Sequence, residues 1–361
     1  MEIYIDLISD TATRPTRGMR TAMFEAEVGD EQRGEDPTVN KLLEIVVDLL
    51  GQDRALFLPS GTMCNQIAIA VHCNAGDEVI SASNSHIISS EGAGAAVFSG
   101  AVIRGIDTRN GIFTAEQLFD AIRPLKIKSP RTKLVSVEQT TNRGGGAVWK
   151  QEQLFGVVEI AKCHGLNVHM DGARLMNAAV CSSAPVGSYT KFFDSVWIDF
   201  TKGLGCPVGS VLAGSEAFIS QAEYWKHRFG GALRQAGVLA AGAIYALENH
   251  VERLVDDHEN ALNFAKSIEC IDGFTLPLSL PETNIVFVSV KELGVSAPDF
   301  SARLIEKGVR VGVEDSFNLR VVFHLDVNAE KTQRAISAFR EVANELRSSC
   351  KAVSTPTTLG Y

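Results

Sequence analysis

The sequence contains no CxxC pair, and this absence argues against a structural zinc site or a dithiol redox site. Its seven cysteines are scattered along the chain, and we expect most of them to be small buried apolar side chains. They are Cys64, Cys73, Cys163, Cys181, Cys206, Cys270 and Cys350. No metal site is expected.

A run of basic residues is also missing. The chain carries 34 Lys and Arg against 43 Asp and Glu, which gives a formal net charge of −9. Neither a nucleic-acid partner nor an acidic membrane surface is therefore expected. The start, MEIYIDLISD, lacks the features of a secretory signal, and no segment approaches the ~20 apolar residues of a membrane span. We expect a cytoplasmic protein without a membrane partner.

A dinucleotide fingerprint is the third absence. Glycines cluster at 92–94 and 144–146, but neither cluster forms GxGxxG between a strand and a helix. A nicotinamide-dependent dehydrogenase is therefore disfavoured.

Regular alternation of apolar runs and helical periods is what the sequence does show. With 361 residues, 45% of them hydrophobic, the chain can form a large domain and a smaller one. From residue 37 to residue 213 the pattern is βαβα, which is typical of an α/β fold with a mostly parallel sheet. Strands are expected at 55–58, 78–82, 101–106, 133–138, 166–171 and 194–199, and helices at 62–73 and 151–165.

The C-terminal part has a different order of elements. A long helical stretch over 232–268 precedes strands at 284–290 and 319–325 and helices at 298–307 and 329–348. This order predicts a small α+β domain. We therefore divide the chain into an N-terminal arm (1–30), a large domain (31–248) and a small domain (249–361) to which the arm contributes. The arm has too little apolar material for a core of its own, and we expect it to pack on the large domain or on a second subunit.

Polar residues that follow a strand are the candidates for chemistry, because ligands of open α/β sheets bind outside the carboxyl ends of the strands. Ser60, Gly61 and Thr62 follow one strand and open a helix. Their hydroxyls and backbone N–H groups could converge on an anion. An ordinary turn with a helix cap explains the same residues.

Two further places combine charge with apolar surroundings. Asp171 closes an apolar strand and is followed by Gly172 and Arg174. It is either a helix cap paired with that arginine or a buried functional carboxylate. Lys202 follows another apolar strand and precedes glycines, so its amine either extends to solvent or is a desolvated nucleophile.

Taken together, the three places supply what pyridoxal 5'-phosphate requires. A lysine amine must bond to its aldehyde, a carboxylate must keep its ring nitrogen protonated, and a helix N-terminus must hold its phosphate. Asp171 precedes Lys202 by about thirty residues, which is one βα step plus a strand, so both can reach the same sheet edge.

With these residues in place, the sequence resembles the low-specificity L-threonine aldolases, pyridoxal-phosphate enzymes of the aspartate-aminotransferase-like fold type I. The matching motifs run in order along nearly the whole chain. They are DLISDTATRPT, GEDPTVN, FLPSGTMCN, SHI, EGAGA, MDGARLMNA, TKGLGCPVGS, GGALRQAG and RVVFHLDV.

The resemblance implies a role for each matching residue. Lys202 would be the Schiff-base lysine, Asp171 the partner of the pyridine nitrogen, and His86 the imidazole stacked on the ring. Gly61 and Thr62, beside Ser60, would hold the phosphate, and Arg234 would reach a phosphate of the neighbouring subunit. The substrate carboxylate would meet three residues, Ser9, Arg174 and Arg320, and Arg174 would also bind the cofactor.

Two of these assignments have simple structural alternatives. His86 lies in the serine-rich stretch SASNSHIISS, where an isolated histidine is ordinarily a loop residue bonded to backbone. Arg320 lies inside LRVVF, where its guanidinium either binds a carboxylate ligand or forms a surface ion pair with an acid such as Asp315.

The sequence departs from the family pattern at three positions. Arg33 stands where relatives commonly have Tyr, Thr141 where many bacterial members have His, and Ile8 where Arg is frequent. A threonine hydroxyl cannot take up a proton near neutral pH as an imidazole can, so His86 or a bound water would have to be the base for aldol cleavage.

Two activities fit these residues. One is cleavage of L-threonine, L-allo-threonine or a related β-hydroxy amino acid to glycine and an aldehyde. The other is racemisation of an amino acid such as alanine, since fungal alanine racemases are similar to threonine aldolases. A catalytically silent binding protein is the alternative from another class. The family resemblance implies a homodimer or homotetramer with shared active sites.

Overall fold

The computed structural model describes the backbone of residues 3–353 and the side chains as far as residue 348. The chain divides into two compact units. Thr13–Val255 form the large unit, and the residues up to Ala12 join those from Asp256 onward in the small unit. Each unit is described by itself below. The expected boundaries at residues 30 and 248 stay a prediction.

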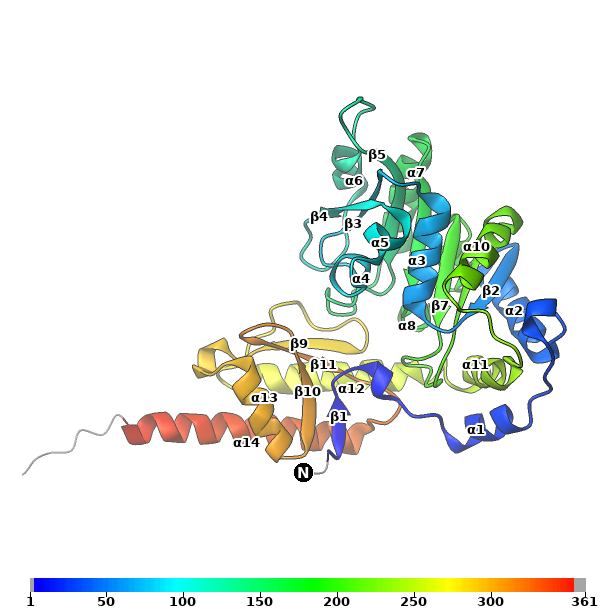
Figure 1. The fold of residues 1–361 in the computed structure, drawn as a ribbon. Helices are drawn as coiled ribbons and strands as arrows, with labels where there is room; N and C mark the ends of the chain where they lie inside the picture. Colours follow the sequence, from blue (N-terminus) through cyan, green and yellow to red (C-terminus); the bar gives the residue numbers. More distant parts are fainter. Residues whose placement is uncertain (1–2, 354–361) are drawn as a thin grey trace, which may run out of the picture. The chain divides into compact units, whose positions relative to one another are not determined.

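A seven-stranded sheet is the centre of the large unit (Figure 1). Its strand order is β2-β8-β7-β6-β5-β3-β4. Every neighbouring pair is parallel except the two that β8 makes, so the predicted mostly parallel sheet is confirmed. The strands are β2 (Arg54–Leu58), β3 (Asp77–Ala82), β4 (Val102–Ile106), β5 (Arg131–Glu138), β6 (Asn167–Gly172), β7 (Ser195–Asp199) and β8 (Ser210–Gly214).

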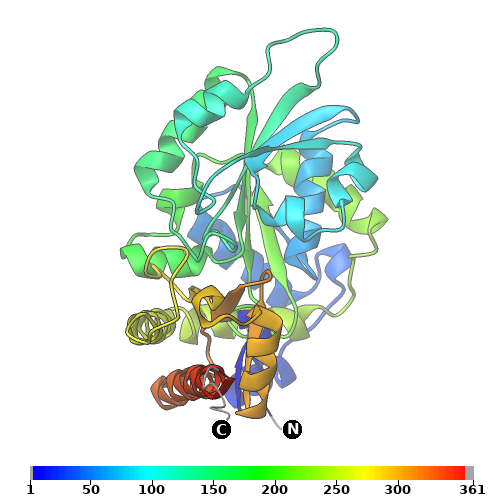
Figure 2. The ribbon, with the colours of Figure 1, turned by 90° about the vertical axis from the view of Figure 1, so that its left-hand side faces the viewer.

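Helices cover both faces of this sheet (Figure 2). On one face α3 and α10 bury residues such as Ile67 and Phe218 against Leu212. On the other face α2 and α7 pack onto the alternate residues of the strands. The helices are α1 (Arg17–Phe24), α2 (Pro37–Leu50), α3 (Gly61–His72), α4 (His86–Ser89), α5 (Gly94–Ser99), α6 (Ala115–Ala121), α7 (Gln151–Cys163), α8 (Leu175–Ser182), α9 (Gly187–Thr190), α10 (Glu216–Arg228) and α11 (Gly237–Asn249), with a 3-10 turn η2 (Glu31–Arg33).

Local sequence signals set several helix ends. Asp36 precedes the proline that opens α2, and its carboxylate accepts hydrogen bonds from the amides of Thr38 and Val39. Gly51 ends the helix with φ of +64°, a left-handed conformation in which glycine meets no Cβ penalty. A capping box between Thr114 and Gln117 opens α6 in the same way.

The small unit has a four-stranded sheet in the order β1-β10-β11-β9. β1 runs parallel to β10, and the other pairs are antiparallel. Its elements are β1 (Ile5–Leu7), η1 (Asp10–Ala12), the greater part of α12 (Leu254–Glu269), β9 (Ile285–Ser289), η3 (Lys291–Leu293), α13 (Ala297–Glu306), β10 (Val309–Val313), β11 (Asn318–Val322) and α14 (Ala329–Val353).

The N-terminal arm takes part in both units. Residues 5–7 add β1 to the small sheet, where Ile5 pairs with Val309. Helix α1 packs against α11 in the large unit. The arm therefore contributes a strand to the small sheet and also packs within the large unit.

Two expectations about elements and side chains were wrong. The helical stretch over 232–268 is broken after Asn249, because His250 leaves the helix and its ring Nδ1 hydrogen-bonds the carbonyl of Leu204 at 2.7 Å. The cysteines are not mostly buried among those described. Cys64, Cys73 and Cys206 are buried, whereas Cys163, Cys181 and Cys270 are exposed on helices or at helix ends, and the Cys350 side chain lies outside the described part.

Within residues 3–353, none of the helices has the length together with the apolar composition that crossing a membrane requires.

Candidate active site

Polar side chains line the face of the central strands that α3 covers. Along β6 and β7 the apolar residues, such as Met170 and Ile198, point into the main core on the other face. The alternate positions on β5, β6 and β7 hold buried polar residues, namely Ser136, Glu138, His169, Asp171, Ser195 and Asp199. Strands buried on both faces are usually apolar throughout, so this polar face requires internal hydrogen bonds.

The predicted anion site is the N-terminus of α3. Ser60 caps this helix, and its hydroxyl accepts a hydrogen bond from the Met63 amide at 3.3 Å. Gly61 lies against Trp197 so closely that a Cβ at this position would be 2.1 Å from the indole ring. Thr62 is exposed. The helix of 12 residues thus presents free N–H groups beside two hydroxyls, as phosphate binding requires.

Asp171 ends β6 with a relative exposure of only 3%. One carboxylate oxygen accepts from the Asn65 side-chain amide at 2.8 Å, and the other accepts from the Ala173 amide at 3.1 Å. Burial raises the pKa of the Asp171 carboxyl, while the charges of His86 and Lys202 and the Asn65 hydrogen bond act in the opposite direction. The side chain is therefore a desolvated acid that further cationic partners would keep ionised.

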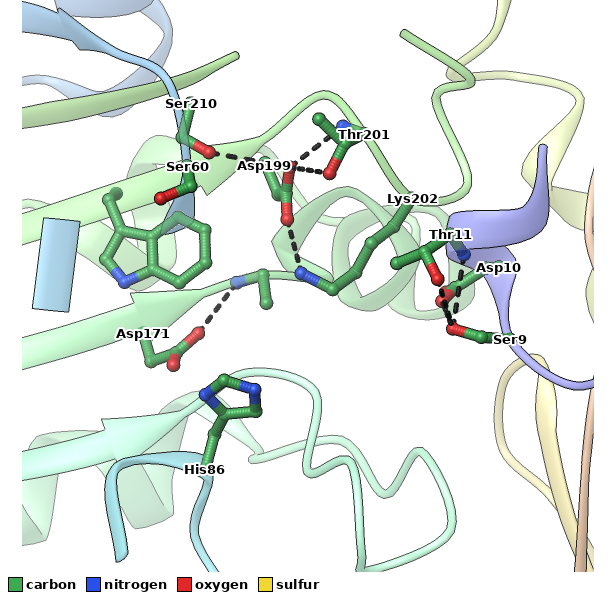
Figure 3. A network of polar contacts seen from close by, with 12 residues as sticks. Ser9, Asp10, Thr11, Ser60, His86, Asp171, Asp199, Thr201, Lys202 and Ser210 are labelled. Carbon is green, nitrogen blue, oxygen red and sulfur yellow. Dashed lines mark hydrogen bonds and ion pairs between the residues drawn. The ribbon is translucent and has the colours of Figure 1, made fainter. Parts of the chain in front are cut away.

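His86 begins α4 and is tied to a buried acid. Its Nδ1 donates to Glu91 at 2.7 Å, and its backbone amide donates to Glu138 at 3.1 Å. Burial alone would lower the pKa of the imidazole. The hydrogen bond to Glu91 and the negative charges of Asp171, Glu91 and Glu138 outweigh burial and raise the pKa above its ordinary value. Figure 3 shows His86 beside Asp171.

The sequence motifs did not single out Glu138 as a site residue. It ends β5, in register with Asp171 on β6. Its carboxylate accepts from the amides of His86 and Asn142 at 3.1 and 2.9 Å. Burial, with the charge of Asp171 adding to it, raises the pKa of this carboxyl to about 7. Glu138 can therefore exchange a proton near neutral pH.

Lys202 lies in the loop that joins β7 to β8. Its amine contacts a carboxylate oxygen of Asp199, and it lies 5.5 Å from the centre of the Trp197 ring (Figure 3). The other oxygen of Asp199 accepts from the amide and the hydroxyl of Thr201 at 2.8 and 2.7 Å. The side chain is mostly buried, so the lysine points into the protein rather than to solvent.

The three residues predicted for the substrate carboxylate belong to different units. Arg174 is buried in the large unit just before α8, and its backbone amide donates to the Gln139 carbonyl at 3.0 Å. Ser9 and Arg320 belong to the small unit, the first before η1 and the second on β11. Their joint role stays a prediction.

Arg234 and two residues at which the sequence departs from the family pattern differ in their surroundings. The guanidinium of Arg234 is mostly exposed and pairs with Asp30 at 3.0 Å, and Arg33 pairs with the same carboxylate at 3.7 Å. Thr141 is buried, and its hydroxyl has no hydrogen-bond partner among the described residues. The threonine side chain lies against Gly111 and Gly144 and not in an open site.

His86, Glu91 and Asp171 are also the group that most resembles a metal site in the described part of the chain. One ligand atom from each lies within 4.8 Å of the others. These atoms are already hydrogen-bonded, directly between His86 and Glu91 and through Asn65 to both carboxylates. The polar atoms of this cluster therefore already have hydrogen-bond partners among neighbouring side chains.

Asn65, Glu91 and Asp199 are further site residues that the motifs did not point to individually. Asn65 alone among them leaves a trace in the sequence, because it and Gln66 are amides in the mostly apolar helical run TMCNQIAIAV. An internal amide on such a helix indicates a buried polar partner.

Comparison with known proteins places the chain in a class. The family model described as Beta-eliminating lyase matches residues 6–293. The chain therefore belongs to the beta-eliminating lyase family. A solved structure of a Leishmania major threonine aldolase has the same fold, with a TM-score of 0.80 at 18% identity over 94% of this chain and 99% of that one.

Two curated relatives narrow this class. The low specificity L-threonine aldolase of Escherichia coli is 39% identical over 93% of this chain and 98% of its own length. Low-specificity L-threonine aldolase 1 of Arabidopsis thaliana is 37% identical over 93% of this chain and 96% of its own length. The chain is a member of the low-specificity L-threonine aldolase family, which consists of pyridoxal-phosphate-dependent lyases of fold type I. The predicted family and fold class are confirmed.

Proposed function

We propose that this protein is a low-specificity L-threonine aldolase, which cleaves L-threonine, L-allo-threonine or a related β-hydroxy amino acid to glycine and an aldehyde. The observation that carries the proposal is that Asp171 and Lys202 lie at the same edge of the central sheet. Asp171 lies near the end of β6 and Lys202 follows the neighbouring parallel strand β7, both at the carboxyl edge of the sheet. Family membership supports the same activity.

The residues at this edge fit pyridoxal 5'-phosphate. Lys202 offers a mostly buried amine, Asp171 a buried carboxylate, and Ser60, Gly61 and Thr62 the N-terminus of α3. The bound cofactor supplies an electron-withdrawing ring that stabilises negative charge on the amino acid's α-carbon. Asp171 would hold the proton at the ring nitrogen, and His86 would lie against the ring.

In this proposal, arginine side chains bind the carboxylate group of the substrate. Arg174, Ser9 and Arg320 would hold that group and so orient the α-carbon, whose bond to the β-carbon breaks in aldol cleavage. A guanidinium matches a carboxylate through two parallel hydrogen bonds and therefore fixes its orientation.

Cleavage also needs a group that takes the proton of the β-hydroxyl. His86 is our candidate, since its Nε2 is free to accept while Nδ1 is bonded to Glu91. Glu138 lies next to it with a pKa of about 7 and can share the proton. Thr141 is not a candidate, because its buried hydroxyl lies against backbone glycines.

Alanine racemisation is the second candidate activity. Racemisation moves a proton at the α-carbon and needs a second acid or base besides Lys202. Glu138, with a pKa of about 7, favours it as such a group. The absence of an imidazole at position 141 favours it as well.

One assay separates the two activities. The purified protein, loaded with pyridoxal phosphate, is given L-threonine and L-allo-threonine in one series and L-alanine in another. We expect acetaldehyde from the first series, lost in Lys202→Ala, and no D-alanine from the second. D-alanine without acetaldehyde would assign the racemase. If neither product formed, the proposal would be overturned.

The proposal includes a homodimer or homotetramer in which Arg234 reaches the phosphate site of a second subunit. Two features of the large unit support it. The Arg234 side chain is mostly exposed although it pairs with Asp30. The apolar side chains of Phe24, Val97 and Phe98 are exposed as well. A cytoplasmic location belongs to the same proposal.

A further inference from the structure

A line of hydrogen-bonded side chains extends from the predicted cofactor residues into the interior of the large unit. His72 Nε2 lies 2.8 Å from the Ser195 hydroxyl, and that hydroxyl lies 2.8 Å from His169 Nδ1. His169 Nε2 lies 3.1 Å from the Asn65 side-chain oxygen. The Asn65 amide nitrogen then reaches Glu91 at 2.7 Å and Asp171 at 2.8 Å.

The register of the strands and the helix brings these residues together. His169 and Asp171 alternate on β6 and lie in register with Ser195 and Trp197 on β7. All four therefore share one face of the sheet. Asn65 and His72 are seven residues apart on α3, so they share the helix face that covers these strands.

Trp197 decides which way the Asn65 amide points. The indole nitrogen can only donate a hydrogen bond, and it lies 2.7 Å from the Asn65 side-chain atom that must therefore be the oxygen. The nitrogen of the amide is then left for the two carboxylates. Each of its two hydrogens meets one of them, so Asn65 joins Asp171 to the acid that holds His86.

The Asn65 oxygen also determines which ring nitrogen of His169 carries the proton. Since it only accepts, His169 must donate from Nε2, which leaves Nδ1 to accept from the Ser195 hydroxyl. Burial lowers the pKa of His169 to about 3 and that of His72 to about 4, so both rings are neutral at pH 7. Every hydrogen bond in the line then has one donor and one acceptor.

We propose that His169 and Ser195 are positioning residues that lock the Asn65 amide with both hydrogens toward Asp171 and Glu91. Through that amide they fix the direction of the Asp171 carboxylate and keep it ionised. Their effect on the cofactor rests on the proposed function, whereas the orientation of the amide does not.

The orientation is tested without cofactor. In protein labelled with ¹⁵N-histidine, the His169 ring nitrogens should show a neutral ring with the proton on Nε2, unchanged between pH 5 and pH 9. Ser195→Ala should weaken this preference, because it removes the donor to Nδ1. Ser136→Ala is the matched control, since Ser136 lies in register on the other side of His169. A proton on Nδ1, or a charged ring, in the wild-type protein would overturn the proposal.

The effect on the site is tested with two variants of one residue. The Gln side chain of His169→Gln can place a donor where Nε2 lies, whereas the Asn side chain of His169→Asn is too short to reach Asn65. We expect pyridoxal phosphate to bind His169→Asn roughly tenfold more weakly than wild type and His169→Gln nearly as tightly.

Unfolding temperatures without cofactor serve as the control for both variants. The proposal is contradicted if His169→Asn and His169→Gln lose cofactor affinity equally. It is also contradicted if both keep their affinity and are equally destabilised, because His169 would then have only a structural role. If the wild-type protein itself binds no pyridoxal phosphate, the proposed function fails, and the histidine spectra still decide the orientation of the amide.

Discussion

Three carboxylates surround the imidazole of His86. Glu91 accepts its Nδ1 hydrogen, while Asp171 and Glu138 add negative charge nearby. Together they raise the pKa of the ring above its ordinary value although burial acts against them. A ring with a raised pKa holds its proton to higher pH, so it becomes a proton acceptor only above that pKa.

His86→Phe should remove the proton acceptor and keep an aromatic ring beside the cofactor site. We expect kcat for L-allo-threonine to fall roughly a hundredfold. In the wild-type enzyme, kcat should rise with pH through a midpoint above 6.5, since only the neutral imidazole can accept, and this rise should vanish in the variant. Steady-state rates between pH 5 and pH 9 measure both effects.

His164→Phe provides the matched control, because His164 is an exposed residue at the end of α7. It should leave both the rate and the pH profile unchanged. A wild-type pH profile that persists in His86→Phe would assign the proton to another group, with Glu138 as the nearest alternative.

Single residues could be predicted from the sequence where they end a strand or open a helix. Lys202, Asp171 and Ser60 were found in this way, and the family motifs added His86. Asn65 and Glu91 were not singled out, because an amide or a carboxylate in the sequence does not by itself show which buried side chains it will meet. Glu138 was visible at the end of an apolar run, but its raised pKa comes from burial beside Asp171, which only the structure shows.

At the scale of elements, the N-terminus of α3 depends on a residue without a side chain. Gly61→Ala would place a Cβ 2.1 Å from the Trp197 ring, so either the helix or the indole must move. We expect the free energy of unfolding to fall by about 1–3 kcal/mol. The affinity for pyridoxal phosphate should fall with it, because the displaced helix carries the phosphate site. Denaturant titration and cofactor titration measure the two effects.

Gly156→Ala serves as the control for that substitution. A Cβ on this glycine, inside α7, would meet only Ala115 at an ordinary 3.5 Å. The change should stabilise the protein by up to about 1 kcal/mol and leave cofactor affinity unchanged. If Gly61→Ala behaved like Gly156→Ala, the close packing of α3 on Trp197 would not be a determinant of the site.

Elements were predictable where hydrophobic periodicity is strong, as in the six strands expected for the large sheet. The antiparallel strand β8 was missed although its cause is in the sequence. Only the residues 200–209 separate it from β7, too few for the helical crossover that a parallel strand needs. The break after α11 was unpredictable, because it depends on His250 bonding a carbonyl 46 residues away.

At the scale of the whole molecule, the account predicts that active sites are shared between subunits. Arg234→Ala should weaken cofactor binding roughly tenfold or more, and Lys202→Ala should abolish activity. The Arg234→Ala and Lys202→Ala chains can be unfolded and refolded together. Each mixed dimer then has one active site in which both Lys202 and Arg234 are native. We expect roughly a quarter of wild-type activity to return in the mixture.

The individually refolded variants are the controls for the mixture. Activity that stays at the sum of the separate variants would place Arg234 and Lys202 in the same subunit's site or would exclude Arg234 from it. Sedimentation of each sample shows whether the oligomer formed.

The fold class of the whole molecule followed from the alternation of strands and helices and from the family motifs. The pairing partner of the first strand did not. Ile5 pairs with Val309, some three hundred residues further on, and three residues of strand carry no signal of a partner so distant. Long-range pairing of this kind becomes visible only in the structure.

The central claim is that the amine of Lys202 binds the aldehyde of pyridoxal phosphate. Its most direct test is reduction of the loaded enzyme with borohydride, followed by digestion and mass spectrometry of the peptides. The account predicts that the cofactor is attached to Lys202. Attachment to a different lysine, such as the buried Lys226, or to no lysine at all, would contradict it.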